Sequence, residues 1–182
     1  MRNFWLALVS CLSLSVTLVY AATPEVGDQA PNITLESLTG EMVTLSDVTA
    51  EGPVVLLQLR GYPGYQCPVC SRQVHDFIDH GEEFAAAGAR VLLVYPGPNE
   101  NLKMRAEEFV QDKTLPDNFT LLLDPDFSFV NLYGLRWEAE GQTAYPSTFL
   151  IDTSGKIFFR KVGTAVADRT SAADMVEQLK AN

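Results

Sequence analysis

Two cysteines separated by two residues are the side chains in this sequence that are best suited to catalyse a reaction. Cys67 and Cys70 follow an apolar run and a loop rich in glycine and proline, and Pro68 favours the first turn of a helix. Sulfurs at this spacing lie on one helical turn, close enough to form and break a disulfide. Unpaired N–H groups at the start of a helix stabilise a thiolate, so we expect the pKa of Cys67 to be lowered. Cys67 is therefore predicted to attack a disulfide, and Cys70 to release the product by closing Cys67–Cys70.

Two other interpretations of the cysteine pair remain open. A permanent disulfide would stabilise the fold little, because so short a loop removes little entropy from the unfolded chain. A zinc or copper site needs further ligands, and His75 and His80 point to different faces of the expected helix. Ser71 excludes the C-x-x-C-H attachment of haem. The sequence thus predicts no cofactor and no metal, and a redox-inactive or metal-delivery module remains an alternative function.

A proline directly before a strand is the second candidate feature of the site. Pro146 precedes the apolar segment 147–151. It is either an ordinary strand-initial proline or a cis-proline that faces the cysteines and exposes backbone to an incoming chain. Ordinary packing is the alternative role for the nearby aromatic side chains, Tyr62 among them. The expected substrate-binding surface consists of Pro63, Tyr65, Tyr145 and Pro146.

The elements that must position these residues follow from hydrophobic periodicity. Alternating residues around Thr39-Gly40 predict a hairpin. Apolar runs and helical spacing predict three central strands and four helices. A four-residue turn at 152–155 permits only an antiparallel pair after them. The predicted strands are 33–36, 42–45, 53–59, 90–95, 119–123, 147–151 and 156–162, and the helices are 68–88, 102–110, 127–132 and 170–181. This order predicts an α/β fold whose central mixed sheet, parallel in the middle and antiparallel at one edge, is flanked by helices.

The beginning of the chain resembles a secretion signal. Residues 1–3 carry a positive charge, residues 4–20 are uncharged and mostly apolar, and small residues follow. We expect cleavage after Ala21 or Ala22 and a periplasmic or secreted protein. An uncleaved membrane anchor and lipidation of Cys11 are the alternatives, and only these would bring the protein to a membrane.

Composition limits the remaining function classes. The 182 residues suffice for one domain, which we place at 22–182 after a signal peptide at 1–21. Lys and Arg number 13 against 23 Asp and Glu, giving a net charge of −10, so a nucleic-acid partner is not expected. Three cysteines are too few for a disulfide scaffold, so the fold must depend on a hydrophobic core.

Several segments resemble the thioredoxin superfamily. These are GYQCPVC after VVLLQLR, the late segment YPSTFLIDTSGKIFF, and the order of elements. The segments LLLDPDFSFVNLYGL and GDQAPNITLESLTGEMVTLSDV resemble the redoxin branch, the alkyl hydroperoxide reductase/thiol-specific antioxidant family with its peroxiredoxin-like relatives. The resemblance spans Val26 to Leu179. It implies a thioredoxin-like fold with an N-terminal β-hairpin, and an oxidoreductase active in cell redox homeostasis.

The resemblance also implies an alternative reaction. Peroxiredoxins carry P-x-x-x-T-x-x-C, in which Pro63 and Cys70 match and Cys67 takes the place of Thr. Cys70 would then be the peroxidatic cysteine and Cys67 its resolving partner. The family's arginine near the position of Pro146 is also missing, and its candidate substitutes are Arg60, Arg72 and Arg136. The expected partners are protein or small-molecule disulfides, peroxides under this second reading, and an unidentified thiol electron donor or acceptor.

Overall fold

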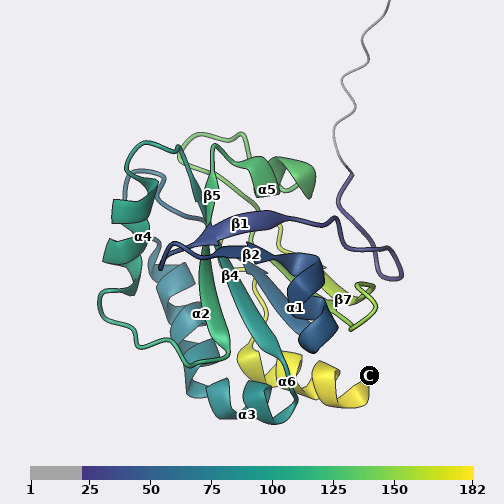
Figure 1. The fold of residues 1–182 in the computed structure, drawn as a ribbon. Coiled ribbons are helices and arrows are strands. Elements are labelled where there is room, and N and C mark those ends of the chain that lie inside the picture. Colours follow the sequence, from purple (N-terminus) through teal and green to yellow (C-terminus); the bar gives the residue numbers. More distant parts are fainter. Residues whose placement is uncertain (1–21) are drawn as a thin grey trace, which may run out of the picture.

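A seven-stranded β-sheet with the order β2-β1-β5-β4-β3-β6-β7 forms the centre of the computed structural model, which describes residues 22–182 (Figure 1). Its strands are β1 Thr34–Ser37, β2 Met42–Thr44, β3 Val54–Gln58, β4 Arg90–Gly97, β5 Phe119–Pro125, β6 Ser147–Ile151 and β7 Ile157–Val162. The helices are α1 Leu45–Glu51, α2 Pro68–Asp79, α3 Gly81–Ala86, α4 Leu102–Val110, α5 Ser128–Leu132 and α6 Ala172–Ala181. The expected signal peptide and Cys11 lie outside the described residues.

The strand directions confirm the predicted mixed sheet, and they show antiparallel strands at one edge more than the sequence predicted. β3, β4 and β5 run parallel, and β6 and β7 follow antiparallel on the side of β3. The N-terminal hairpin adds to the opposite side, because β1 pairs antiparallel with both β2 and β5. The sheet is therefore antiparallel at both edges, whereas the sequence predicted this for one edge.

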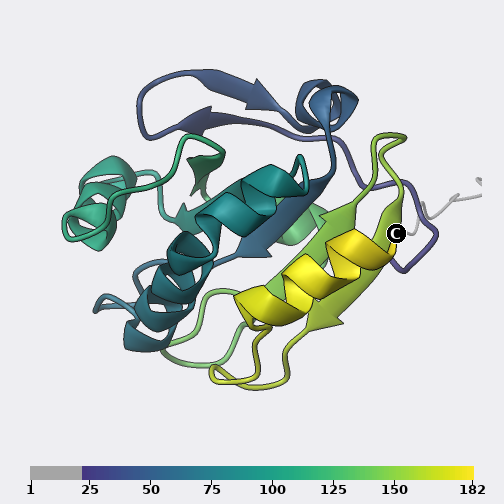
Figure 2. The ribbon, with the colours of Figure 1, turned by 90° about the horizontal axis from the view of Figure 1, so that it is seen from below.

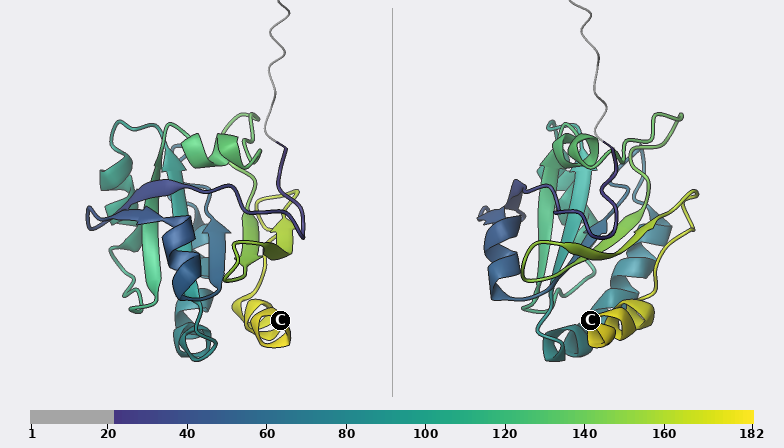
Figure 3. Two further views of the ribbon diagram at one scale, coloured as in Figure 1. Left: turned by 45° about the vertical axis from the view of Figure 1, so that its right-hand side comes forward. Right: turned by 90° about the vertical axis from the view of Figure 1, so that its right-hand side faces the viewer.

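Helices cover both faces of the sheet. Side chains of α2, α3, α4 and α6 share one hydrophobic cluster, and those of α1 and α5 share the other. Figure 2 shows α2 and α6 lying side by side over the first face, and Figure 3 shows α1 on the opposite side of the sheet. Successive residues of β3 alternate between the clusters, so this strand is buried on both faces.

Two helices differ from the sequence prediction. The helix expected over 68–88 is two helices, because the backbone leaves helical geometry at His80, with φ −100° and ψ 14°. Gly81 follows against the Pro116 ring, where an added Cβ would come within 2.7 Å. Helix α1 was not expected: Leu45, assigned to a strand by alternation, is its first residue and is buried. Helix α4 begins and ends where the sequence predicted it.

The loop between β3 and α2 carries the candidate site. β3 ends at Gln58 and α2 begins at Pro68, so both cysteines lie beyond the carboxyl ends of the parallel strands. Gly61 adopts a φ of +71° and packs directly against the Pro96 carbonyl at the end of β4. Within residues 22–182, no helix has the length and apolar character needed to span a membrane.

Candidate active site

The start of helix α2 presents the sulfur of Cys67 to the backbone of its own first turn. Cys67 is the N-cap residue, and its sulfur accepts the N–H of Cys70 at 3.3 Å. Pro68 occupies the first turn, where a missing N–H costs no helical hydrogen bond. Both cysteines are free thiols, and each is only 1% exposed. The expected placement of the pair at a strand-to-helix junction is confirmed.

These contacts favour a thiolate at Cys67. A hydrogen bond from the Cys70 side chain lowers the pKa of Cys67 to about 5, against the opposing effect of burial. The Cys70 N–H, the positive charge of Arg169 and a hydrogen bond from the Arg60 side chain lower this pKa further. A thiol with this pKa is ionised at neutral pH and is a competent nucleophile.

The sulfur of Cys70 has the opposite balance. Burial raises the pKa of Cys70 well above its ordinary value, and the neighbouring Cys67 adds to the shift. Two donors oppose this: the backbone N–H of Arg60 at 3.4 Å and the Nη2 atom of Arg169 at 3.3 Å. The pair therefore shares one negative charge, which resides mainly on Cys67.

Arg60 links the active-site loop to the segment that follows α5. Its side chain is buried, its Nη1 donates to the hydroxyl of Tyr65 at 2.8 Å, and its Nη2 donates to the Gly141 carbonyl. The Thr143 hydroxyl donates to the backbone carbonyl of Arg60. Of the three arginines considered from the sequence, Arg60 is the one whose backbone N–H bonds to the Cys70 sulfur. Arg72 is exposed on α2, and Arg136 lies over the Phe127 ring.

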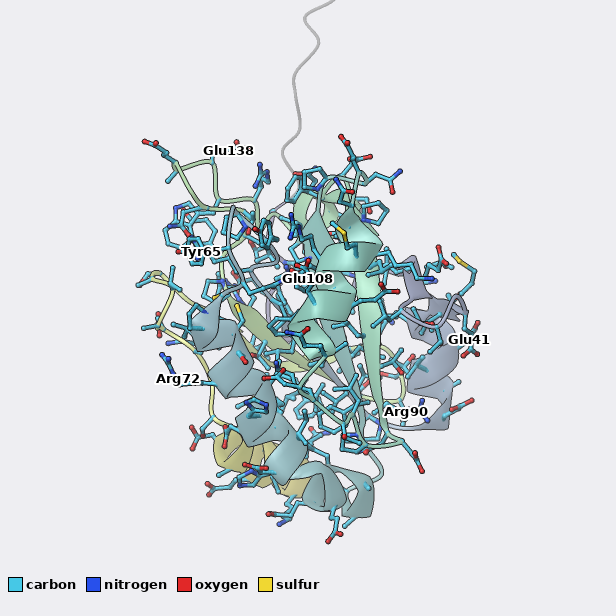
Figure 4. The ribbon with its side chains drawn as sticks, turned by 90° about the vertical axis from the view of Figure 1, so that its left-hand side faces the viewer. Glu41, Tyr65, Arg72, Arg90, Glu108 and Glu138 are labelled. Carbon is cyan, nitrogen blue, oxygen red and sulfur yellow. The ribbon has the colours of Figure 1, made fainter. Side chains whose placement is uncertain are left out.

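The expected substrate-binding residues lie in two loops, one before α2 and one before β6, and differ in exposure. Tyr65 is 53% exposed and lies beyond the beginning of α2 in Figure 4. Pro63 lies partly buried in the same loop. Tyr145 is half-buried and stacks on Trp137, with ring centroids 4.7 Å apart. Its packing is consistent with the alternative role named for the aromatic residues.

The proline before β6, Pro146, follows an ordinary trans peptide bond. No peptide bond within residues 22–182 is cis, so of the two interpretations left open for Pro146 the structure has the ordinary strand-initial proline. Pro146 is buried, and its carbonyl accepts the N–H of Gly163 at 2.8 Å. That carbonyl is thus already paired within the fold.

Access to Cys67 is from the side of α4. A cleft of about 280 Å³ has Cys67, Pro68 and Ser71 on one wall, with Glu108 and Asp112 on the other. Figure 4 shows Glu108 on α4, near the first turn of α2. The cleft thus lies directly beside Cys67, whose own surface is almost fully covered.

Gln66 connects the residue before Cys67 to two other elements. Its side-chain oxygen accepts the hydroxyl of Tyr95 at 2.9 Å, and its Nε2 donates to the Arg105 carbonyl at 2.8 Å. Glu108 accepts a longer bond from the same nitrogen at 3.4 Å. These bonds fix the approach of the loop to α2, and the sequence pattern gave no sign of them.

Arg169 is the functional residue that sequence reasoning missed. It lies in the loop between β7 and α6, two residues before the Ser171 cap, and 99 positions from Cys70. No local motif marks such a contact. The sequence signal that remains is an arginine shortly before the C-terminal helix.

The hydrogen-bond partner found for a histidine in residues 22–182 is a backbone oxygen and not a cysteine sulfur. His80 Nδ1 lies 2.8 Å from the Asp76 carbonyl, and His75 is exposed. Within residues 22–182, no group of three or more His, Cys, Asp or Glu side chains is arranged to hold a metal ion.

The chain is similar to known proteins in family, sequence and fold. A profile described as the AhpC/TSA family matches residues 26–160. A putative peroxiredoxin of Mycobacterium tuberculosis is 33% identical over 136 residues, covering 72% of this chain and 80% of the relative. The thiol-disulfide oxidoreductase ResA of Halalkalibacterium halodurans is 26% identical, covering 98% of this chain and 96% of the relative.

The fold has the same relatives. The crystal structure of peroxidoxin BcpB from Mycobacterium tuberculosis superposes with a TM-score of 0.71 at 24% identity, covering 86% of this chain and 96% of that chain. Peroxiredoxins and thiol-disulfide oxidoreductases among the relatives indicate an oxidoreductase. The chain therefore belongs to the AhpC/TSA family, the redoxin branch of the thioredoxin superfamily, as its motifs led us to expect.

Proposed function

We propose that this oxidoreductase exchanges thiols and disulfides, with Cys67 as the attacking residue and Cys70 as the resolving residue. The observation that carries the proposal is the placement of the Cys67 sulfur on the Cys70 N–H at the start of α2, with a pKa lowered to about 5. The reaction needs no cofactor, because the two sulfurs themselves carry the two electrons.

The first half of the reaction is attack by the Cys67 thiolate on a substrate disulfide. A bond forms between the Cys67 sulfur and one substrate sulfur, and the other substrate sulfur leaves as a thiolate. The cleft beside α4 is the proposed entry, since it reaches Cys67 between Ser71 and Glu108. In the second half, Cys70 attacks Cys67, and the Cys67–Cys70 disulfide forms as the remaining substrate sulfur leaves.

Trapping tests the order of the two cysteines. The Cys70→Ser variant removes the resolving sulfur, so it is expected to accumulate a mixed disulfide on Cys67 with a disulfide substrate. Cys67→Ser is the matched control, and it should accumulate none at neutral pH because Cys70 has a raised pKa. A mixed disulfide that forms on Cys70 in Cys67→Ser, as fast as on Cys67 in Cys70→Ser, would refute the proposal.

A thiol peroxidase is the second candidate, and two contacts to Cys70 favour it. The sulfur of Cys70 receives the Arg60 N–H and the Arg169 guanidinium, which would hold a thiolate for attack on peroxide. Attack would produce a sulfenic acid on Cys70 and release water or an alcohol. Cys67 would then resolve it as the disulfide and release water. Sulfenic acid on Cys70 in Cys67→Ser after peroxide treatment, with turnover by a thiol reductant in the wild type, would establish this reaction.

We further propose that the protein works outside the cytoplasm. Support comes from the positively charged start and the uncharged run at 4–20. The expected mature chain begins at Ala22 or Thr23. Mass spectrometry of the protein from its native cells, fractionated by compartment, measures this directly. An intact N-terminus in the cytoplasmic fraction would contradict it.

A further inference from the structure

We propose that Arg169 is a catalytic residue that holds the Cys70 sulfur as a thiolate while it attacks the disulfide formed on Cys67. The inference rests on the proposed function, and it concerns the second half of that reaction. Its primary observation is the 3.3 Å hydrogen bond from Arg169 Nη2 to the Cys70 sulfur. A guanidinium bound to a reacting atom stabilises negative charge on that atom.

The guanidinium of Arg169 is held by every one of its nitrogen atoms. Nε donates to the Val166 carbonyl at 2.7 Å, and Nη1 donates to the Gln73 side-chain oxygen at 2.8 Å. Gln73 is itself fixed, since its Nε2 donates to the Thr170 carbonyl at 3.1 Å. The planar fork therefore has one orientation, with its remaining nitrogen directed at Cys70.

The loop that carries Arg169 is tied to the elements on both of its sides. Asp168 pairs with Lys161 of β7 at 2.6 Å and accepts the N–H of Thr164 at 2.9 Å. The N–H of Ala172, at the start of α6, donates to Asp76 of α2 at 2.7 Å. The position of Arg169 is thus set by contacts independent of the sulfurs, and the cation is in place before the reaction begins.

The second half of the reaction needs such a cation. Cys70 is 1% exposed, and burial raises the pKa of its thiol. Once Cys67 is in a mixed disulfide, its sulfur carries no negative charge, so the positive charge of Arg169 acts on Cys70 alone. A buried thiolate that lacks a charged partner is expensive to form.

The side chains of the other titratable residues that the structure describes near Cys70 place no positive charge on its sulfur. Arg60 donates its backbone N–H to Cys70, while its guanidinium bonds to Tyr65 and Gly141. Burial raises the pKa of Tyr95, which therefore stays a neutral phenol. Arg169 is the cationic side chain that the structure places on this sulfur within residues 22–182.

The proposed step balances in atoms and electrons. The Cys70 thiol gives its proton to solvent, and its thiolate forms a bond to the Cys67 sulfur. The bond between Cys67 and the substrate sulfur breaks, and that sulfur leaves as a thiolate that takes a proton from solvent. The two protein thiols are oxidised by two electrons, and the substrate disulfide is reduced to two thiols.

Single-turnover kinetics with the chromogenic disulfide dithiobis(nitrobenzoate) separates the two halves. The first nitrothiobenzoate released reports attack by Cys67, and the second reports resolution by Cys70. In Arg169→Met, the second release is expected to slow by roughly 10- to 100-fold, the effect of losing a hydrogen bond to a charged group. Its pH midpoint should move upward, whereas the first release at neutral pH should change little because Cys70 still donates to Cys67.

Two further variants make the result specific. Arg72→Met removes an exposed arginine of α2 and is expected to leave both phases unchanged. Arg169→Lys keeps the charge but not the fork, so its second phase should lie between those of the wild type and Arg169→Met. It also serves as the test if Arg169→Met does not fold, which loss of the first phase would reveal.

Different results would refute the role of Arg169 and the proposed attack by Cys67. If the first phase is normal and both Arg169 variants resolve at the wild-type rate with the wild-type pH midpoint, the role of Arg169 is refuted. If instead Cys70→Ser releases no nitrothiobenzoate at all, Cys67 does not attack and the proposed function fails. A structural role alone would alter both phases together without shifting the pH midpoint of the second.

Discussion

The backbone N–H of Cys70 points at the sulfur of Cys67 across 3.3 Å, so the last residue of the motif stabilises the first. The same contact caps helix α2, whose first N–H groups have no partner within the helix. One hydrogen bond therefore serves both the fold and the nucleophile. Protonation of the Cys67 thiolate should consequently lower both the free energy of unfolding and the reactivity of the sulfur.

The stability of the reduced protein should depend on pH through Cys67. Its pKa is about 5 in the folded protein, against an ordinary value of 9.0. Between these values the unfolded chain binds a proton that the folded protein has released, so the free energy of unfolding rises with pH. The stabilisation is complete above the unfolded pKa and is lost as pH falls through the folded pKa.

Urea denaturation at about pH 6 and about pH 8 measures this slope. Cys67→Ser removes the titrating group, so its free energy of unfolding should rise less across the same interval than that of the wild type. Equal slopes in the two proteins would mean that Cys67 is not ionised in the folded state.

Arg60 should matter for both stability and reactivity. Arg60→Met leaves the Tyr65 hydroxyl and the Gly141 carbonyl without their donor, at an expected loss of about 1–3 kcal/mol in the free energy of unfolding. The pKa of Cys67 should rise, because the Arg60 side chain helps to lower it. Denaturation and the pH profile of alkylation are the measurements. The exposed Arg72→Met is the matched control, and equal behaviour of the two variants would count against this role.

Alanine substitutions at two glycines should distinguish the cost of an unfavourable backbone conformation from the cost of a steric overlap. Gly61 and Gly88 have nearly the same φ, +71° and +68°, but only at Gly61 would an added Cβ overlap another group, the Pro96 carbonyl. Gly88→Ala is expected to cost about 1–2 kcal/mol through its backbone conformation alone. Gly61→Ala should cost more and should also slow thiol exchange, since it displaces the loop before Cys67. Equal losses of stability in the two variants would show that the approach to β4 contributes nothing.

The charge of the disulfide should affect its rate of reaction. The chain carries a net charge of −10. In the cleft beside Cys67 the carboxylate of Asp112 pairs with Lys113 and that of Glu108 pairs with Arg105, so the expected attraction comes from the charge of the whole chain. Cationic cystamine is therefore expected to react faster than a dicarboxylate disulfide of equal leaving-group pKa at low ionic strength. The difference should shrink as salt is added, because the cleft is open to solvent. A ratio of rates that does not change with salt would show that the negative charge of the chain does not steer the substrate.

Local patterns in the sequence sufficed for most of the fold. The bounds of α4 follow from its apolar spacing, and the hairpin follows from alternation around Thr39-Gly40. The failures have local causes. Leu45 continues the alternation of β2, yet the backbone turns into α1 there. The helix breaks at His80, next to the point where Gly81 packs against Pro116. A tertiary contact of this kind leaves no periodic signal.

The candidate site divides in the same way. Cys67 and Cys70 could be predicted because a two-residue spacing after a buried strand is a local property. The Arg169 contact joins residues 99 positions apart, and the bonds of Gln66 reach both β4 and α4. Such partners are chosen by the folded topology. The conformation of Pro146, which the sequence left open between cis and trans, is trans in the fold.

The pH dependence of alkylation at each cysteine tests the central claim most directly. The reduced wild-type protein is treated with iodoacetamide over a range of pH, and mass spectrometry measures the rate at Cys67 and at Cys70. We predict that Cys67 reacts first, with a midpoint near pH 5, and that Cys70 stays largely unlabelled at neutral pH. Preferential labelling of Cys70, or a Cys67 midpoint near the ordinary value of 9.0, would contradict the account.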